Sequence, residues 1–282
     1  MKAIYLLFIC IIYYSDSFSQ MYSVQLINKD NGERIPYANI GIVNKNIGTV
    51  SNTKGEFNIE LSSKYDNDTL YISCIGYERK AYSISKFKNS FRNIDQCIVE
   101  LQPKIYVLDE IVVKPTNMRI YTLGNFCEAN SAYGNAFYSK ELGTEIGVLV
   151  NLPDNKNNAY LQNFRFYVGK FTFDKFPVRL NVYDLKNGKP NENILTEPIF
   201  IEITRTGEYI IELEKYEIIT NGDFFISLEY YRVPDIKEGE LIFCSVEKED
   251  KNNSYYRLTS QASWILEVAA NIGFSVQIKC KE

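Results

Sequence analysis

Strict alternation of apolar and polar residues is the feature that most constrains the fold of this chain. In the segment EFNIEL, Phe57, Ile59 and Leu61 would point to one side of an extended strand, and the three polar residues between them to the other. Short segments of this kind recur along the chain, separated by turns rich in Asn and Gly. The 22 Tyr and 17 Phe favour the same pleated, half-buried surfaces. The sequence therefore predicts an all-β protein.

The pattern divides the chain into two parts. Residues 21–103 contain roughly seven short strand segments, which is enough for a small β-sandwich. Residues 123–282 contain a second series, with turns at the spacing of an antiparallel sandwich. We therefore predict two β-sandwich domains, joined by a connecting strand or linker at residues 104–122.

Residues 1–20 have the pattern of a secretory signal peptide. Lys2 precedes an apolar run over residues 3–14, which is shorter than the ~20 residues of a membrane-spanning helix. Residues 17–19, SFS, form a small-x-small cleavage pattern. We expect cleavage near Gln20 and an exported protein with no transmembrane segment after cleavage. An uncleaved anchor is the alternative.

Three ordered motifs in the first domain resemble a known family. They are IPYANIGI (35–42), GTVSNTKGEFNIEL (48–61) and DTLYISCIGYE (68–78). They resemble the carboxypeptidase-regulatory-like domain of exported Bacteroidota proteins, which implies a transthyretin-like β-sandwich. Such a protein would be periplasmic, associated with the outer membrane, or extracellular. In these motifs Gly48 and Gly55 suit tight connections with positive φ or close backbone approach.

The second domain is more loosely similar to jelly-roll-like modules that accompany the first domain in such proteins. The similar segments are VRLNVYDLKNGKPNENIL (178–195), GEYIIELEKYEI (207–218) and DFFISLEYY (223–231). No motif in them carries an activity.

The composition argues against an enzyme. The chain has no histidine, which excludes histidine-held zinc, Ser-His-Asp and Cys-His nucleophile systems, and HExxH metalloproteases. Closely spaced carboxylates occur in two pairs, Glu212 with Glu214 and Glu238 with Glu240, and solvated positions are the simpler interpretation. We expect no catalytic residue, no metal and no cofactor. The net charge of −4 gives no reason to expect nucleic acid.

Signal cleavage would leave five cysteines, an odd number with no CxxC spacing. If one disulfide forms, Cys74 with Cys97 is the pair we predict, because both lie in expected strands of one domain. The alternative is that the cysteines are small buried hydrophobes.

The segment LDEIVVKP (108–115) resembles the stretch that precedes a plug and barrel in exported receptors. A transporter barrel of about 22 strands needs roughly 220 residues in strands alone, more than follow Pro115. Two interpretations remain: a linking strand within this chain, or an exposed strand that pairs with another protein by β-augmentation. The candidate partner-binding residues are Leu108, Asp109, Glu110, Ile111, Val112 and Val113.

Glycan binding is a second possible function. Adjacent tyrosines on a strand point to opposite faces, so one ring of each pair is expected to reach solvent. The candidate glycan-binding residues are Tyr230, Tyr231, Tyr255 and Tyr256. Trp264 shares its expected strand face with Leu266 and Val268, which predicts a core position.

These observations predict a non-enzymatic, exported structural or adaptor protein that binds another envelope or surface protein through sheet edges or the connecting strand. A carbohydrate-binding module is the alternative.

Overall fold

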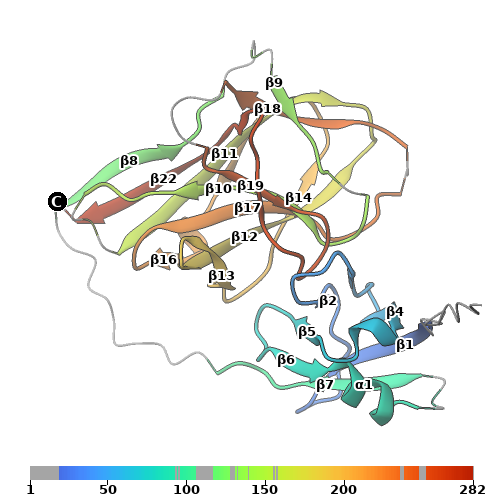
Figure 1. The fold of residues 1–282 in the computed structure, drawn as a ribbon. Helices are drawn as coiled ribbons and strands as arrows, with labels where there is room; N and C mark the ends of the chain where they lie inside the picture. Colours follow the sequence, from blue (N-terminus) through green and yellow to red (C-terminus); the bar gives the residue numbers. More distant parts are fainter. Residues whose placement is uncertain are drawn as a thin grey trace, which may run out of the picture.

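The computed structural model describes residues 19–281 with gaps at 93, 95, 106–116, 128–130, 132, 139, 155, 157, 236–237 and 248–251. Figure 1 shows two β domains, with the first (β1 to β7) lying against one side of the second. The predicted all-β fold with two β-sandwich domains is confirmed. No helix among the described residues has both the length and the apolar character to cross a membrane.

The first domain contains two facing sheets, in the orders β4-β1-β7 and β3-β2-β5-β6. Its elements are β1 (Ser19–Asn28), β2 (Asn39–Ile42), β3 (Gly48–Val50), β4 (Glu56–Ser62), η1 (Ser63–Tyr65), β5 (Thr69–Ser73), β6 (Lys80–Ser83), α1 (Ile84–Ser90) and β7 (Cys97–Leu101). In β4 the predicted alternation is confirmed, because Phe57, Ile59 and Leu61 are buried. Gly55 has the predicted positive φ, at 73°.

The second domain contains a seven-stranded and an eight-stranded sheet. Its strands are β8 (Met118–Gly124), β9 (Tyr133–Asn135), β10 (Thr144–Val150), β11 (Ala159–Phe171), β12 (Phe176–Lys186), β13 (Lys189–Asn193), β14 (Ile199–Ile203), β15 (Gly207–Glu212), β16 (Ile219–Thr220), β17 (Phe224–Tyr230), β18 (Leu241–Val246), β19 (Ser254–Arg257), β20 (Ile265–Leu266), β21 (Asn271–Ile272) and β22 (Phe274–Lys281), with η2 (Glu214–Tyr216) after β15.

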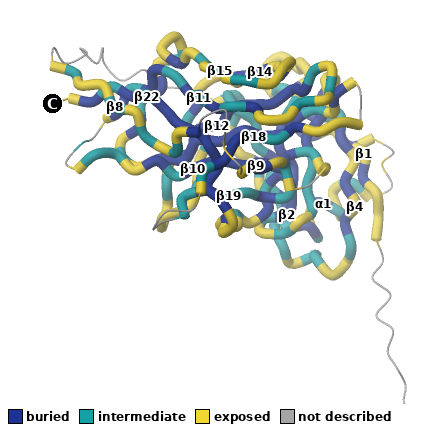
Figure 2. Tube along the Cα trace, turned by 90° about the horizontal axis from the view of Figure 1, so that it is seen from above, coloured by how far each residue is buried: buried dark blue, intermediate teal, exposed yellow. Residues whose placement is uncertain are grey.

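The core of the second domain fills the space between its two sheets. The seven-stranded sheet contributes alternate residues of β10, β12 and β17, such as Val148, Leu180 and Ile226. The eight-stranded sheet contributes residues such as Phe164 and Phe274. Strands β10, β12 and β17 are buried on both faces, not on one, and Figure 2 colours β10 and β12 as buried along much of their length.

Two expectations for the second domain differ from the structure. Strand β8 begins at Met118, inside the segment predicted to connect the domains, and pairs with β22. The expected strand around Trp264 is only β20, two residues long, and the predicted core face there is wrong: Leu266 is 39% and Val268 64% exposed. Trp264 is half-buried and packs edge-on against Phe225 on the sheet face away from the core.

Candidate functional sites

Four charged residues form a row across the seven-stranded sheet. Arg179 of β12 lies opposite Glu229 of β17, which lies opposite Glu145 of β10, which lies opposite Arg257 of β19. Each carboxylate pairs with the adjacent arginine, with N–O distances of 2.7 Å for Arg179–Glu229 and 2.5 Å for Arg257–Glu145. All four residues are buried on the face away from the domain core. On each strand, the residue that belongs to the row therefore lies next to residues that face the core on the opposite side of the sheet.

Neutral polar groups complete the hydrogen bonds of the two carboxylates. Asn181 Nδ2 donates to Glu145 Oε1 at 3.0 Å and to Glu229 Oε2 at 2.7 Å. Tyr183 OH and Ser227 Oγ also donate to Glu145. Buried charges are stable only when they are paired and hydrogen-bonded in this way.

The environments of the two glutamates shift their pKa values in opposite directions. Burial raises the pKa of Glu145 above its usual value; Arg257 counteracts this in part, and the neighbouring Glu229 reinforces it. Burial also disfavours the charged form of Glu229, but Arg179 and Arg257 outweigh it and lower its pKa. Neither side chain has any exposed surface, so a substrate has no access to this carboxylate pair.

The first domain covers the end of this row. Asn39 of β2 donates to Glu229 Oε1 at 2.8 Å, and Arg179 donates through Nη1 to the backbone oxygen of Tyr37 at 2.6 Å. The Tyr37 ring packs edge-on against Tyr231 of the second domain, with centroids 4.8 Å apart. The charged row thus joins the two domains as well as four strands.

A loop of the second domain makes the other half of the domain contact. In Figure 1 the loop after β19 reaches the first domain beside β2. A Cβ atom added to Gly41 or to Gly48 would collide with the backbone oxygen of Ser260, so glycine lets the two backbones approach. Asn44 N donates to Gln261 O at 3.0 Å, and Gln261 Nε2 donates to Ser73 Oγ at 3.0 Å. The close approach predicted for Gly48 is therefore one between domains.

A cleft of about 660 Å³ lies between the domains, beside the charged row. The first domain contributes the turn after β5 and the residues after β7, and the second contributes β12, β13 and Gln261. Arg179, Asn181 and Arg257 line the cleft as well as binding the two buried glutamates. Among the described residues, no group of three or more His, Cys, Asp or Glu side chains is placed to hold a metal ion.

The candidate glycan-binding tyrosines do not form one surface. Tyr230 and Tyr231 are 8% and 6% exposed, so the expectation that one of them reaches solvent is wrong. Tyr230 packs in the domain core, whereas Tyr231 points to the face that the first domain covers. Tyr255 and Tyr256 on β19 are half-buried, and Tyr256 stacks on Tyr138 with centroids 4.0 Å apart.

The closely spaced carboxylates considered from the sequence are all exposed. Two of them form surface ion pairs, Glu214 with Lys279 and Glu240 with Lys170. They do not converge on the interdomain cleft.

The candidate partner-binding residues 108–113 lie outside the described residues. The strand that follows them, β8, is an edge strand. Of the described edge strands, β8 and β4 are the longest, with seven residues each. Strand β4 carries two glutamates, whereas the charged residue of β8 is Arg119 alone. Because charged residues protect sheet edges from pairing, β8 is the least protected of these long edges.

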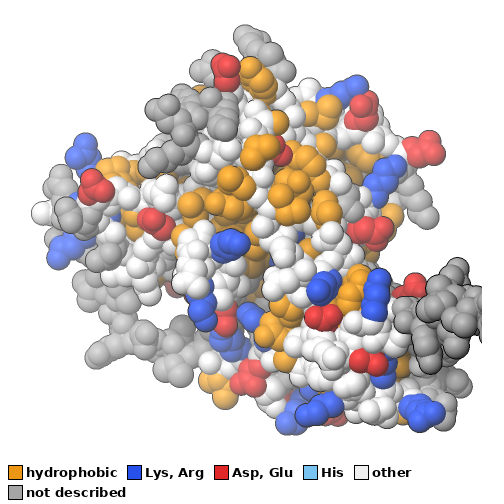
Figure 3. All heavy atoms as spheres, in the orientation of Figure 1, with side chains coloured by type: hydrophobic (Ala, Val, Ile, Leu, Met, Phe, Trp, Pro, Cys, Tyr) orange, Lys and Arg blue, Asp and Glu red, His pale blue; other side chains and the backbone are white. Residues whose placement is uncertain are grey.

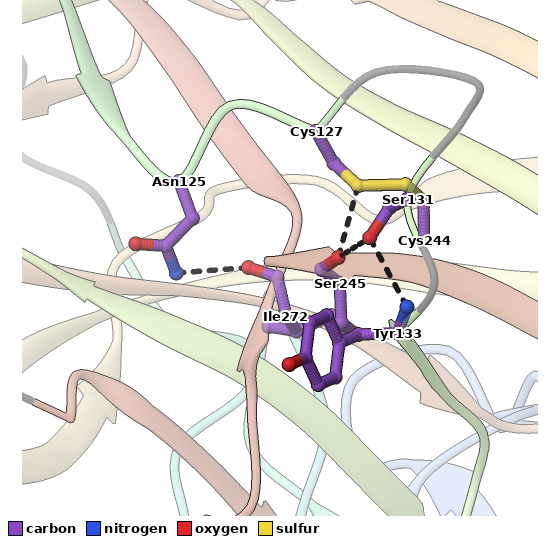
Figure 4. The surroundings of a disulfide bond; sticks show 7 residues. All are labelled: Asn125, Cys127, Ser131, Tyr133, Cys244, Ser245 and Ile272. Atoms are coloured by element: carbon purple, nitrogen blue, oxygen red, sulfur yellow. Dashed lines mark hydrogen bonds between the residues drawn. A yellow bond between two sulfur atoms is a disulfide. The ribbon is translucent and has the colours of Figure 1, made fainter. Parts of the chain in front are cut away.

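One disulfide joins Cys127 to Cys244 of β18, and Cys74 and Cys97 are free. The predicted pairing of Cys74 with Cys97 is therefore wrong. These two residues belong to different sheets of the first domain: Cys97 is on β7 of one sheet, and Cys74 follows β5 of the other sheet and lines the interdomain cleft. Figure 4 shows Ser131 Oγ donating to Ser245 O next to the disulfide. A Cβ at Gly273 would collide with Cys127, so glycine makes room for the bond.

Comparisons with known proteins found a family that the first domain is similar to. Residues 25–113 match the CarboxypepD_reg-like domain family. No curated protein matches the chain. A solved structure of the cysteine protease and lectin-like domains of Cwp84, a surface layer associated protein of Clostridium difficile, is similar at 9% identity and a TM-score of 0.37. The similar region covers 60% of this chain and 37% of the Cwp84 chain. This likeness is too distant to carry a conclusion about fold or function.

Proposed function

We propose that this protein is an exported, non-enzymatic adaptor whose two domains act as one rigid unit and bind another envelope protein through the open edge of β8. The observation that carries the proposal is the exposed edge itself. Strand β8 pairs with β22 on one side, and no described strand pairs with its other side. An extended segment of a partner would complete the sheet by β-augmentation.

The side chains of β8 suit such a contact. Ile120 is 53% exposed, and Arg119, Tyr121 and Leu123 accompany it along the strand. Exposed apolar residues on a long, weakly charged edge are an aggregation hazard unless a partner covers them. We expect the partner to contribute an extended, mainly apolar strand, and residues 108–113 to extend the contact.

Two observations support the remaining parts of the proposal. The disulfide between Cys127 and Cys244 suits an oxidising, extracytoplasmic compartment. The buried carboxylates of Glu145 and Glu229 form ion pairs with arginines, and neither glutamate has exposed surface that a substrate could reach. An adaptor needs neither a catalytic group nor a cofactor.

The test is a pull-down of the epitope-tagged full chain from gently solubilised envelopes, with Ile120→Lys as the variant. Lysine on an edge strand opposes pairing. Ile210→Lys on β15 is the matched control, because Ile210 is 52% exposed and also lies on an edge strand. We expect a stoichiometric partner that is lost with Ile120→Lys and kept with Ile210→Lys. Capture that is equal in both variants, or no stoichiometric partner with the natural chain, would refute the β8 contact.

A further inference from the structure

The interdomain cleft has the size and position of a ligand site. Its volume of about 660 Å³ falls within the ~300–1,000 Å³ typical of small-molecule pockets, which favour domain boundaries. Both of its walls are held in place, because Arg179 and Asn39 bind the same carboxylate, Glu229, from opposite domains. The cleft is therefore preorganised, which lowers the entropy lost on binding.

The lining is rich in amide side chains, which can both donate and accept hydrogen bonds. The amide residues that are exposed or partly exposed are Gln102, Asn191, Asn193 and Gln261, whereas Asn39 and Asn181 also line the cleft but are buried and bind Glu229. Arg257 also lines the cleft, and its Nε finds no acceptor among the described residues. Such a surface suits a ligand that carries many hydroxyl groups.

The charges around the cleft balance. Arg179 and Arg257 are neutralised by Glu229 and Glu145 behind them. Arg79 pairs with Glu192 across the domain boundary at 3.6 Å, and the lining adds one further base and one further acid, Lys104 and Glu78. Figure 3 shows basic and acidic side chains interspersed where the domains meet. A lining without surplus charge favours an uncharged ligand.

Apolar groups lie among these polar ones. Ile75, Tyr77, Ile105 and Leu195 contribute to the same lining. A sugar ring has hydroxyl groups at its edge and C–H groups on its faces, so it matches a lining of amides mixed with apolar side chains. We propose that the interdomain cleft binds a short, uncharged oligosaccharide.

This site differs from the one predicted at Tyr230, Tyr231, Tyr255 and Tyr256, since the cleft is lined by none of these residues. It is also independent of the β8 edge, because the cleft is lined by no residue of β8. An adaptor with such a site would hold a partner protein and a glycan at the same time.

The test uses isothermal titration calorimetry on the mature chain with five neutral probes: cellotetraose, laminaritetraose, maltotetraose, mannotetraose and xylotetraose. Tetragalacturonate is the charged comparison. Asn191→Trp places a bulky ring at the exposed rim of the cleft, and Asn58→Trp, on the exposed face of β4, is its matched control. Thermal unfolding of the two variants checks that both are folded.

Cys74 supplies a second readout, because this residue lines the cleft and is only partly buried, whereas the other described free cysteines, Cys97 and Cys280, are buried. Burial raises the pKa of Cys74 to about 11, so alkylation by iodoacetamide is slow and is best followed at mildly alkaline pH. A bound oligosaccharide should slow it further.

We expect at least one neutral tetrasaccharide to bind saturably and to protect Cys74. Its affinity should fall by at least about tenfold in Asn191→Trp and stay unchanged in Asn58→Trp. The proposal is overturned if none of the five binds, if tetragalacturonate alone binds, or if Asn191→Trp binds as tightly as the natural chain. Each of these results leaves the β8 contact untouched.

Discussion

Glu145 and Glu229 lie directly opposite each other on β10 and β17, and each carboxylate forms an ion pair with an arginine from the next strand outward. Two buried like charges side by side are unfavourable unless opposite charges flank them. The outer arginines supply that compensation, and one of them, Arg179, also binds the first domain. The fold therefore uses the same guanidinium to neutralise a carboxylate and to attach a domain.

Glu229→Gln should destabilise the protein by roughly 3–5 kcal/mol near neutral pH, because it leaves Arg179 buried without its counter-ion. The lowered pKa of Glu229 in the natural chain sets the pH dependence. The stability contributed by ionised Glu229 is complete above the ordinary glutamate pKa of 4.5 and is lost as pH falls through the pKa of the folded state. The difference from the natural chain should therefore shrink below pH 4.5. Urea unfolding at several pH values measures it.

Glu145→Gln should show the opposite trend with pH. Burial raises the pKa of Glu145, so the folded state holds its proton above pH 4.5 while the unfolded state releases it. The natural chain then loses stability as pH rises from 4.5 towards the folded value, whereas the glutamine variant does not. Parallel pH profiles for the two variants would contradict the assignment of opposite shifts.

The disulfide should appear in peptide maps as a link between the peptides of Cys127 and Cys244, with Cys74 and Cys97 recovered as free thiols. Replacing both bonded cysteines by alanine should cost about 2–4 kcal/mol, since the bond closes a long loop in the unfolded chain. Denaturant unfolding measures this cost, and Cys280→Ala controls for loss of a buried thiol. A recovered Cys74–Cys97 link would refute the pairing.

Gly41→Ala should loosen the contact between the two domains, because the alanine methyl group would collide with the backbone oxygen of Ser260. We expect a loss of about 1–3 kcal/mol, typical of overpacking. Gly222→Ala is the control, since no atom lies within 4 Å of its added Cβ. Thermal unfolding and limited proteolysis between the domains report the effect, and equal behaviour of the two variants would argue against a tight contact at Ser260.

The sequence predicted the strands and the two sandwiches because period-2 alternation is local information. It could not reveal that the first domain covers a sheet face of the second. Arg179, with Leu180 beside it, has the pattern of an ordinary solvated strand residue, and only strand register brings it next to Glu229. For the same reason Tyr231 appeared to be a surface ring, although it packs against Tyr37 of the other domain.

The prediction of the disulfide was wrong for a similar reason. Cys74 and Cys97 lie in one domain, but proximity in sequence does not place two sulfurs within bonding distance. Cys127 and Cys244, 117 residues apart, are brought together by the strand order of the second domain.

The most direct test of the account is whether the two domains hold one fixed arrangement that depends on Arg179. Spin labels at exposed positions 58 and 186, in a chain with Cys74→Ser, would report the distance between domains by pulsed electron paramagnetic resonance. We predict one narrow distance distribution that broadens with Arg179→Ala. A broad distribution in the natural chain, or a narrow one that Arg179→Ala leaves unchanged, would contradict the role of the charged row in joining the domains.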